Sequence, residues 1–394
     1  MNNFQYYTPT KVFFGKGVEN NVGEVLKEYG ASKVLVHFGG GSAKRSGLMG
    51  RIEASLDAAK IEYIELGGVS PNPKIELVRE GVELCKKEGV DFILAVGGGS
   101  AIDSSKAIAL SLGTGADDWD IITGKVKATK CMPLAAVLTI SAAGSEMSNS
   151  HVITNLSIPM KRGLNTDLIR PVVSFLDPEL TYTVSKYQTA CGVVDIMMHT
   201  MERYFTGDVD TILTDRIAES ILLSVKEAGS VAIENPNDYE ARATIMWSSS
   251  LSHNGLTACG KNFKTLAAHQ LEHGISAVFD NVAHGAGLAV VYPAFSKYLY
   301  KYDLPRYCRM ANKVWGIPEN PDDPEGVALA GIKAMKDYFR SLGMPVSMSE
   351  LGIGPDRFAE IAENVTFGSK RTIPTYKALD NDDIIRIFEL TEID

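Results

Sequence analysis

Histidines and an aspartate occur at spacings that suit a metal site. Asp195 and His199 are four residues apart, as are His269 and His273, and His284 opens a glycine-rich turn. Residues four apart lie on one face of a helix. One carboxylate with three imidazoles suits Fe²⁺ or Zn²⁺ and leaves a coordination position open for a substrate.

A simpler interpretation is that these are ordinary helix histidines, because helix faces produce such pairs by chance. The concentration of four of the seven histidines in two short segments favours the metal site instead. The remaining three, His37, His151 and His253, have no such neighbours in the sequence, and we assign them structural roles.

Two glycine-rich turns follow apolar runs in the first half of the chain, at residues 39–42 and 97–100. Glycines let backbone amides approach an anion, and a helix N-terminus adds partial positive charge, so both turns predict a cradle for the phosphates of a dinucleotide. The alternative is a tight turn in which Ser100 only caps the helix. Neither turn carries the G-x-G-x-x-G fingerprint.

A third loop, residues 141–147, follows the apolar run that ends near Thr139. Hydroxyl groups of Thr139, Ser141 and Ser145 are able to donate hydrogen bonds to a cofactor lying against this backbone. Taken alone, the segment is better explained as an ordinary loop.

The elements that must position these residues differ between the halves. The first half alternates near-continuous apolar strands with amphipathic helices, which predicts a parallel sheet covered on both faces, with binding loops at its carboxyl edge. The expected strands are 33–38, 61–66, 92–96, 133–139 and 172–176, and the expected helices are 51–60, 75–88 and 101–112.

Helical periodicity dominates after residue 178. The expected helices are 186–206, 215–234, 238–254, 263–276, 326–342 and 355–364. We therefore predict an α/β dinucleotide-binding domain over residues 1–184 and an all-α metal-binding domain over residues 185–394, with a cleft between them.

Composition limits the classes of function. The 394 residues are 45% hydrophobic and 22% charged, as in folded water-soluble proteins. A net charge of −9 disfavours nucleic acid and anionic membranes as partners. The five cysteines are scattered, and neither a signal peptide nor an apolar run of about 18 residues is present. We expect a cytoplasmic protein that acts on small molecules.

The sequence resembles the iron-containing (group III) alcohol dehydrogenase family, and within it the NADPH-dependent butanol dehydrogenase and aldehyde reductase branch. The resemblance covers almost the whole chain, and it is carried by residues 9–17, 97–103, 144–147, 176–181 and 284–289.

The resemblance implies a Rossmann-like N-terminal domain and a helical C-terminal domain, the architecture also found in dehydroquinate synthase. It implies Asp195, His199, His269 and His284 as metal ligands, and His273 as a non-ligand near the substrate that supplies a proton. The cofactor residues that it implies are Gly97, Gly98, Ser100, Asp103, Thr139, Ser141, Ser145, Lys161 and Leu180.

Two departures from the family pattern affect the site. The family usually has one residue fewer between its third and fourth ligands, and a loop can absorb this insertion, so His284 is retained as a ligand. Many relatives have threonines where this chain has Ile140 to Ala143. This departure concerns individual cofactor contacts of that loop and not the site as a whole.

The function implied is a metal-dependent, NADP-linked alcohol dehydrogenase that interconverts short- or medium-chain alcohols and aldehydes, as butanol dehydrogenases do. NADP(H) is expected because residues 39–45 contain no acid to repel a 2′-phosphate. Gly39, Gly40 and Ser42 then receive that phosphate, near Lys44 and Arg45. The metal is Fe²⁺ or Zn²⁺.

Other functions remain as alternatives. A dehydroquinate synthase-like or glycerol-type metal and NAD enzyme shares the arrangement, but residues 191–202 and 267–284 contain no Lys or Arg to bind a substrate phosphate. A noncatalytic dinucleotide sensor would not need an open metal position. The expected partners are the small-molecule substrate and a second copy of the chain in a homodimer.

Overall fold

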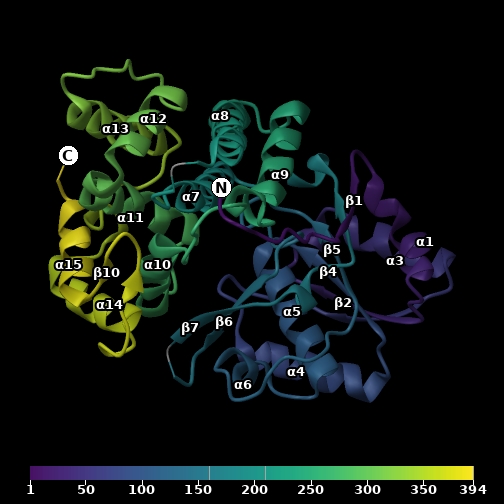
Figure 1. The fold of residues 1–394 in the computed structure, drawn as a ribbon. Coiled ribbons are helices and arrows are strands. Elements are labelled where there is room, and N and C mark those ends of the chain that lie inside the picture. The colour runs from purple at the N-terminus through teal and green to yellow at the C-terminus, as the bar shows by residue number, and fades with distance from the viewer. Residues whose placement is uncertain (159, 209, 394) are drawn as a thin grey trace. The chain divides into compact units, whose positions relative to one another are not determined.

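The computed structural model describes residues 1–158, 160–208 and 210–393 (Figure 1). It divides into an α/β unit, Tyr7–Thr183, and a helical unit made of Val184–Asp394 together with Met1–Tyr6. The first residues join the helical unit through hydrogen bonds: the Asn2 backbone N–H donates to Gly260 O at 3.0 Å, and the Asn2 side chain donates to Asp208 Oδ1 at 2.9 Å.

The α/β unit is built on a six-stranded sheet in the order β1-β8-β5-β4-β2-β3, and every neighbouring pair is parallel. Its strands are β1 (Lys11–Phe14), β2 (Lys33–Phe38), β3 (Glu62–Leu66), β4 (Phe92–Gly97), β5 (Leu134–Leu138) and β8 (Val173–Leu176). The predicted parallel sheet is confirmed. Strand β1 was not among the predicted strands, because its only partner, β8, lies far along the chain.

Helices cover both faces of this sheet, as its continuous apolar strands require. Val34 and Val36 of β2 pack in one core with helices α1 (Val22–Glu28) and α3 (Leu48–Ala58). Leu35, between them, packs on the opposite face with α4 (Ile75–Glu88) and α5 (Gly99–Thr114). Successive side chains of a strand point to opposite faces, so one strand supports both layers.

Strand register places the predicted cofactor loops at one edge. Phe38 at the end of β2 pairs with Val96 of β4, and Gly97 pairs with Leu138 at the end of β5. The loops that follow β2, β4 and β5 are therefore neighbours at the carboxyl edge of the sheet, as expected for a doubly wound fold.

An antiparallel hairpin outside the sheet, β6 (Ser150–Asn155) with β7 (Met160–Asn165), was not predicted.

A buried lysine on α5, Lys106, holds the loop that precedes this hairpin. Lys106 Nζ donates to the backbone oxygens of Ser145, Ser148 and Ser150 at 2.7–3.0 Å. Burial lowers the pKa of Lys106 to about 8, although nearby Asp103 favours its charged form. Two short helices, α2 (Ser42–Arg45) and α6 (Asp118–Ile122), complete the unit.

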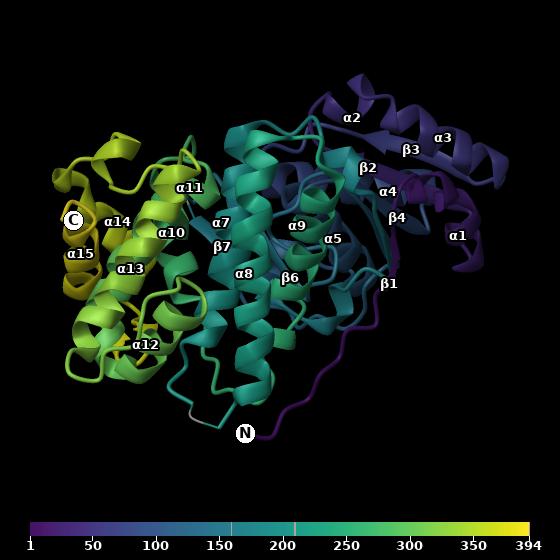
Figure 2. The same ribbon diagram turned by 90° about the horizontal axis from the view of Figure 1, so that it is seen from above.

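The helical unit packs around α7 (Figure 2), and residues 189–204 of this helix are all buried. Its other helices are α8 (Ile212–Glu234), α9 (Tyr239–His253), α10 (Ala267–Val278), α11 (His284–Leu299), α12 (Leu304–Lys313), α13 (Pro324–Ser341), α14 (Phe358–Val365) and α15 (Asn381–Leu390), and α7 itself spans Lys186–Tyr204. The predicted helical second half is confirmed, with one small addition, the two-residue strands β9 (Ile373–Pro374) and β10 (Ala378–Leu379). Among the described residues, we find no helix both long and apolar enough to span a membrane.

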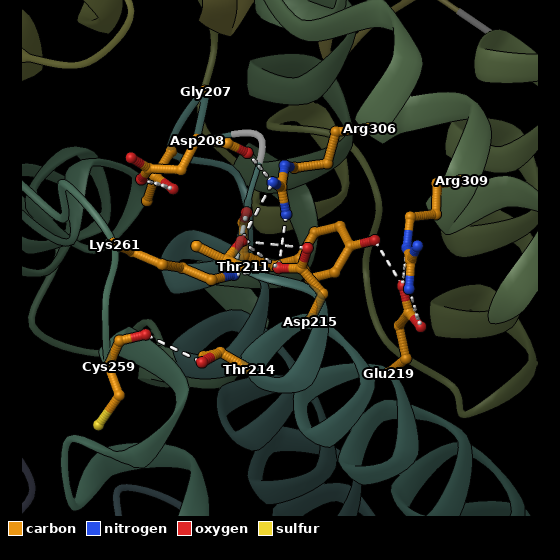
Figure 3. A network of polar contacts seen from close by, with 12 residues as sticks. Gly207, Asp208, Thr211, Thr214, Asp215, Glu219, Cys259, Lys261, Arg306 and Arg309 are labelled. Atoms are coloured by element: carbon orange, nitrogen blue, oxygen red, sulfur yellow. Dashed lines mark hydrogen bonds and ion pairs between the residues drawn. The ribbon is translucent and has the colours of Figure 1, made fainter. Parts of the chain in front are cut away.

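A buried ion network fastens the end of α7 to its neighbours (Figure 3). Asp215 of α8 accepts from Lys261 Nζ at 2.7 Å and from Arg306 Nη1 of α12 at 2.6 Å. Both cations also lie over the ring of Tyr204, the last residue of α7, at 4.9 and 5.0 Å. Burial lowers the pKa of Lys261 to about 8, against the opposing effect of Asp215.

We expect Asp215→Ala to lower the free energy of unfolding by about 3–5 kcal/mol, because it leaves two buried cations without their shared carboxylate. Urea denaturation of the full chain measures this. The control is Asp337→Ala, which breaks an exposed pair with Lys333 and should cost less than about 1 kcal/mol. Equal losses for the two variants would show that the buried network does not stabilise the fold.

Candidate metal and cofactor site

Helix α7 presents Asp195 and His199 from its buried middle. The helix begins at Lys186, where the Ser185 side chain accepts a hydrogen bond from the Gln188 backbone N–H at 3.2 Å. Both candidate ligands are 3% exposed, and Asp195 Oδ1 lies 3.2 Å from His199 Nδ1. The predicted four-residue spacing therefore does place them side by side on one helix face.

Helices α10 and α11 bring the other two candidate ligands to the same oxygen. Asp195 Oδ1 lies 3.3 Å from Nε2 of His269, which is in the first turn of α10. It lies 3.8 Å from Nε2 of His284, the first residue of α11. One carboxylate oxygen is therefore surrounded by nitrogens of three imidazoles, and the extra residue before His284 does not remove that side chain from the group.

The three imidazole nitrogens lie at distances from Asp195 Oδ1 that suit ligands of one metal. The donor atoms of Asp195, His199 and His269 all lie within 4.8 Å of one another, whereas His284 belongs to a second group of donor atoms, with Glu272 and His273. Four ligands at about 2.1 Å from a tetrahedral divalent metal are separated from one another by about 3.4 Å, and the separations from Asp195 Oδ1 are 3.2, 3.3 and 3.8 Å. His199 Nδ1 is buried and makes no hydrogen bond with any residue that the structure describes. Such an atom costs free energy unless a cation or proton satisfies it, so these residues fit a divalent metal.

A second carboxylate on α7, Glu202, fixes the orientation of His269. Glu202 is buried, contacts His269 Nδ1, and accepts a hydrogen bond from the Ala268 backbone N–H at 2.7 Å. It thus satisfies the start of α10 and leaves His269 Nε2 facing Asp195. Sequence reasoning missed Glu202, although its position seven residues after Asp195, on the same helix face, is a readable signal.

Burial and neighbouring charge act differently on the imidazoles. Burial lowers the pKa of His199 well below its ordinary value, and the neighbouring His253 and His269 lower it further. Burial acts in the same direction on His269, but Glu202 and Asp195 outweigh it and raise the pKa of His269 to about 9. His269 therefore carries a proton that a metal would have to displace on binding.

Two other histidines adjoin this cluster. The ring of His273 lies 5.5 Å from the ring of His284 and is less buried than His199 and His269, so its assignment as a proton donor beside the metal remains a prediction. His253, the last residue of α9, was assigned a structural role from its isolation in the sequence. Its ring packs edge-on against His199 with centroids 4.0 Å apart.

The glycine turn after β4 leaves a helix start suited to an anion. Helix α5 begins at Gly99 with Gly98 as its N-cap, and no side chain caps it, so Ser100 is not the cap that the simpler interpretation required. A Cβ on Gly98 would lie 2.0 Å from Ile140 Cγ2. Close packing of two loops thus requires Gly98, and the uncapped backbone N–H groups of the first turn suit a phosphate.

Some predicted cofactor residues instead have partners inside the α/β unit. Asp103 is buried and accepts from Ser145 Oγ at 2.6 Å and from the Val152 backbone N–H at 2.9 Å. Burial raises the pKa of Asp103, with Lys106 and these hydrogen bonds acting against it. Lys161 Nζ donates to Asn72 Oδ1 at 2.9 Å.

The remaining predicted cofactor residues lie near the carboxyl edge of the sheet. The backbone N–H of Thr139 donates to Gly97 O at 3.0 Å, and the buried hydroxyl of Ser141 makes no hydrogen bond with the described residues. Gly39 and Gly40 lie in the turn after β2, and Ser42 is the exposed first residue of α2. Leu180 packs against the apolar core. A cofactor hydrogen bond would satisfy Ser141.

Known proteins resemble the chain along its whole length. Residues 9–178 match the family described as iron-containing alcohol dehydrogenase, and residues 189–391 match the C-terminal part of the Fe-containing alcohol dehydrogenase family. NADH-dependent butanol dehydrogenase A of Clostridium acetobutylicum is 44% identical over 99% of both chains. The NADPH-dependent aldehyde reductase YqhD of Escherichia coli is 36% identical over 90% of both.

A solved structure agrees with these matches. The crystal structure of NADH-dependent butanol dehydrogenase A from Thermotoga maritima has 38% sequence identity, covers 99% of each chain and superposes with a TM-score of 0.95. Both halves of the chain therefore carry the family's sequence and fold. The protein belongs to the iron-containing alcohol dehydrogenase family, and is an alcohol dehydrogenase that uses a nicotinamide cofactor and a divalent metal.

Proposed function

We propose that this enzyme interconverts short- or medium-chain alcohols and aldehydes, working in the direction of aldehyde reduction with NADPH and with Fe²⁺ or Zn²⁺ as its metal. The observation that carries the proposal is the group formed by Asp195 Oδ1 and three imidazole nitrogens at 3.2–3.8 Å. Such a ligand set leaves room for a substrate oxygen.

The chain's own residues divide the work of the reaction. When bound, the metal supplies Lewis-acid stabilisation of charge on the substrate oxygen and the nicotinamide supplies the hydride. Asp195, His199, His269 and His284 hold the metal, in surroundings whose burial strengthens electrostatic interactions. His273 is more exposed than the buried ligands His199 and His269, so it is placed to deliver a proton to the product oxygen and recover one from water.

A substrate without phosphate is favoured because the basic side chain nearest the ligands on α7 is already engaged in other contacts. Arg203 is the nearest basic residue to the ligands on that helix, but its guanidinium is buried and donates to His199 O at 2.8 Å and to Ser252 O at 3.4 Å. These contacts commit Arg203 to holding α7 and α9 together. Residues 191–202 and 267–284, which carry the candidate ligands, contain no Lys or Arg to bind a substrate phosphate, and Arg203 is already engaged with backbone oxygens.

A panel of short- and medium-chain aldehydes tests the proposal. Chelated protein is restored with Fe²⁺ or Zn²⁺, and NADPH absorbance is followed with each aldehyde and, for comparison, with dihydroxyacetone phosphate. We expect turnover of butanal-sized aldehydes that depends on added metal. Turnover of the phosphorylated ketone alone would favour the glycerol-type alternative, and binding of NADPH without any turnover would favour a sensor.

Preference for NADPH is proposed from the turn after β2. The relatives named above include NADH- and NADPH-dependent enzymes, so the choice between the two cofactors is argued from the residues of this turn. It contains no acid, and a Cβ on Gly41 would lie 2.7 Å from Arg45 Nη1, so the Arg45 guanidinium lies over the turn. Lys44 pairs with Glu65 at 2.5 Å and is less available. Arg45 is thus the cation suited to a 2′-phosphate.

We expect kcat/KM to be higher for NADPH than for NADH with the same aldehyde. Arg45→Ala should lower the value for NADPH about ten- to a hundredfold, the cost of a lost hydrogen bond to a charged group, and leave NADH unchanged. Gly40→Asp should shift the ratio toward NADH, and open space around Gly40 admits that side chain. Equal or better use of NADH by the unmodified enzyme would overturn the proposal.

A further inference from the structure

Glu272 is a buried carboxylate of α10 that neither the sequence pattern nor the ligand set explains. Its side chain is fully buried, and one oxygen, Oε2, contacts Nδ1 of the candidate ligand His284. The other oxygen, Oε1, accepts a hydrogen bond from Ser276 Oγ, one turn later on the same helix. A buried carboxylate is costly unless it is hydrogen-bonded, so these contacts account for its position.

A glycine of α11 makes room for this side chain. A Cβ on Gly287 would lie 2.8 Å from Glu272 Cγ, closer than real Cβ atoms approach, and 3.2 Å from Glu272 Oε1, which is tighter than most real contacts. Gly287 is three residues after His284, one turn into the same helix. The absent side chain therefore lets the carboxylate pass α11 and reach the imidazole at its start.

His284 depends on such support more than the other histidine ligands do. Its side chain is 27% exposed, against 4% for His199 and 5% for His269. It stands at the first position of α11, directly after the loop in which this chain has one residue more than its family usually has. It is also the imidazole farthest from Asp195 Oδ1, at 3.8 Å. Packing alone leaves this ring the most freedom.

We propose that Glu272, admitted by Gly287, is the positioning residue for His284 and thereby sets the affinity of the metal site. The carboxylate holds Nδ1, which selects the tautomer whose free nitrogen is Nε2 and turns Nε2 toward Asp195. Such partners also make the ligating nitrogen more basic, and removing them costs about 10- to 100-fold in metal affinity. The inference rests on the proposed role of His284 as a ligand.

The test measures metal binding rather than turnover. Co²⁺ affinity of the full chain is determined by competition with a chromophoric chelator, and the visible absorption of bound Co²⁺ reports its ligand geometry. We expect Glu272→Leu and Gly287→Ala each to weaken Co²⁺ binding about 10- to 100-fold and to change that spectrum. Glu272→Gln keeps an oxygen that accepts from Nδ1–H, and should restore most of the affinity.

Two further variants separate the possible explanations. Glu219→Gln alters another buried carboxylate of the helical unit, bound to Tyr204 at 2.7 Å and to Arg309 at 2.5 Å, and should leave Co²⁺ affinity unchanged even if it lowers thermal stability. If His284→Ala weakens binding while Glu272→Leu and Gly287→Ala do not, the positioning role is wrong and the ligand assignment stands. If His284→Ala itself leaves affinity unchanged, the ligand assignment fails, and the inference fails with it.

Discussion

Replacing Asp195 with alanine is expected to remove the bound metal and to lower kcat by about 10³-fold or more. Asp195 Oδ1 lies 3.2, 3.3 and 3.8 Å from the three imidazoles, and Asp195→Ala removes the one carboxylate, and so the one negative charge, of the assigned ligand set. Lewis-acid stabilisation is worth several kcal/mol, and each 1.36 kcal/mol corresponds to about a tenfold change in rate.

Metal analysis of the purified Asp195→Ala variant, together with its turnover of one aldehyde, decides this prediction. The α/β unit should keep its cofactor binding, because Asp195 belongs to the helical unit. Asp337→Ala, which removes an exposed carboxylate of α13, is the matched control and should retain metal and activity. Full metal occupancy and activity in Asp195→Ala would show that the metal is bound elsewhere.

Replacing His273 with alanine is expected to lower kcat by about 10²- to 10⁴-fold while the metal stays bound. That range is typical of general acid–base groups. His273 lies one turn after His269 on α10, its ring is 5.5 Å from the ring of His284, and it has more contact with solvent than the buried ligands His199 and His269. These properties suit a group that passes a proton and recovers it from water.

Three measurements separate this role from a structural one. Metal content of His273→Ala should equal that of the unmodified enzyme, the pH dependence of kcat should lose the ionisation of the missing imidazole, and added imidazole should restore part of the rate. Loss of metal would make His273 a ligand instead. An unchanged kcat would remove it from the proton path.

Local pattern was sufficient for most elements, with informative exceptions. Helix α11 was not predicted because its sequence is apolar on every side and contains Pro293, so no periodicity distinguishes it from a strand or a loop. Helices α1, α12 and α15, the hairpin β6–β7 and the four-residue strand β1 were missed as well. Strand β1 pairs with β8 in residue pairs such as Phe13 with Phe175, a contact between distant parts of the chain that no local window contains.

The polar contacts of buried charged side chains were the least predictable feature. No sequence pattern indicated that Lys106 is buried, yet it donates to three backbone oxygens. Glu202 and Glu272 each contact the Nδ1 of a different histidine. A charged residue in a helix is usually solvated. Its burial depends on which element packs over it, and that is decided by the whole fold.

The sequence by itself determined three things: that Asp195 and His199 share one helix face, that the first half forms a parallel sheet with glycine turns, and which family the chain resembles. These features follow from periodicities of two and 3.6 residues and from the conformational freedom of glycine. Only the tertiary structure decided that His269 and His284 reach the same carboxylate oxygen, and that Gly287 admits Glu272 to His284. Those contacts between side chains depend on how α7, α10 and α11 pack. Close packing is a property of the folded chain rather than of any one segment.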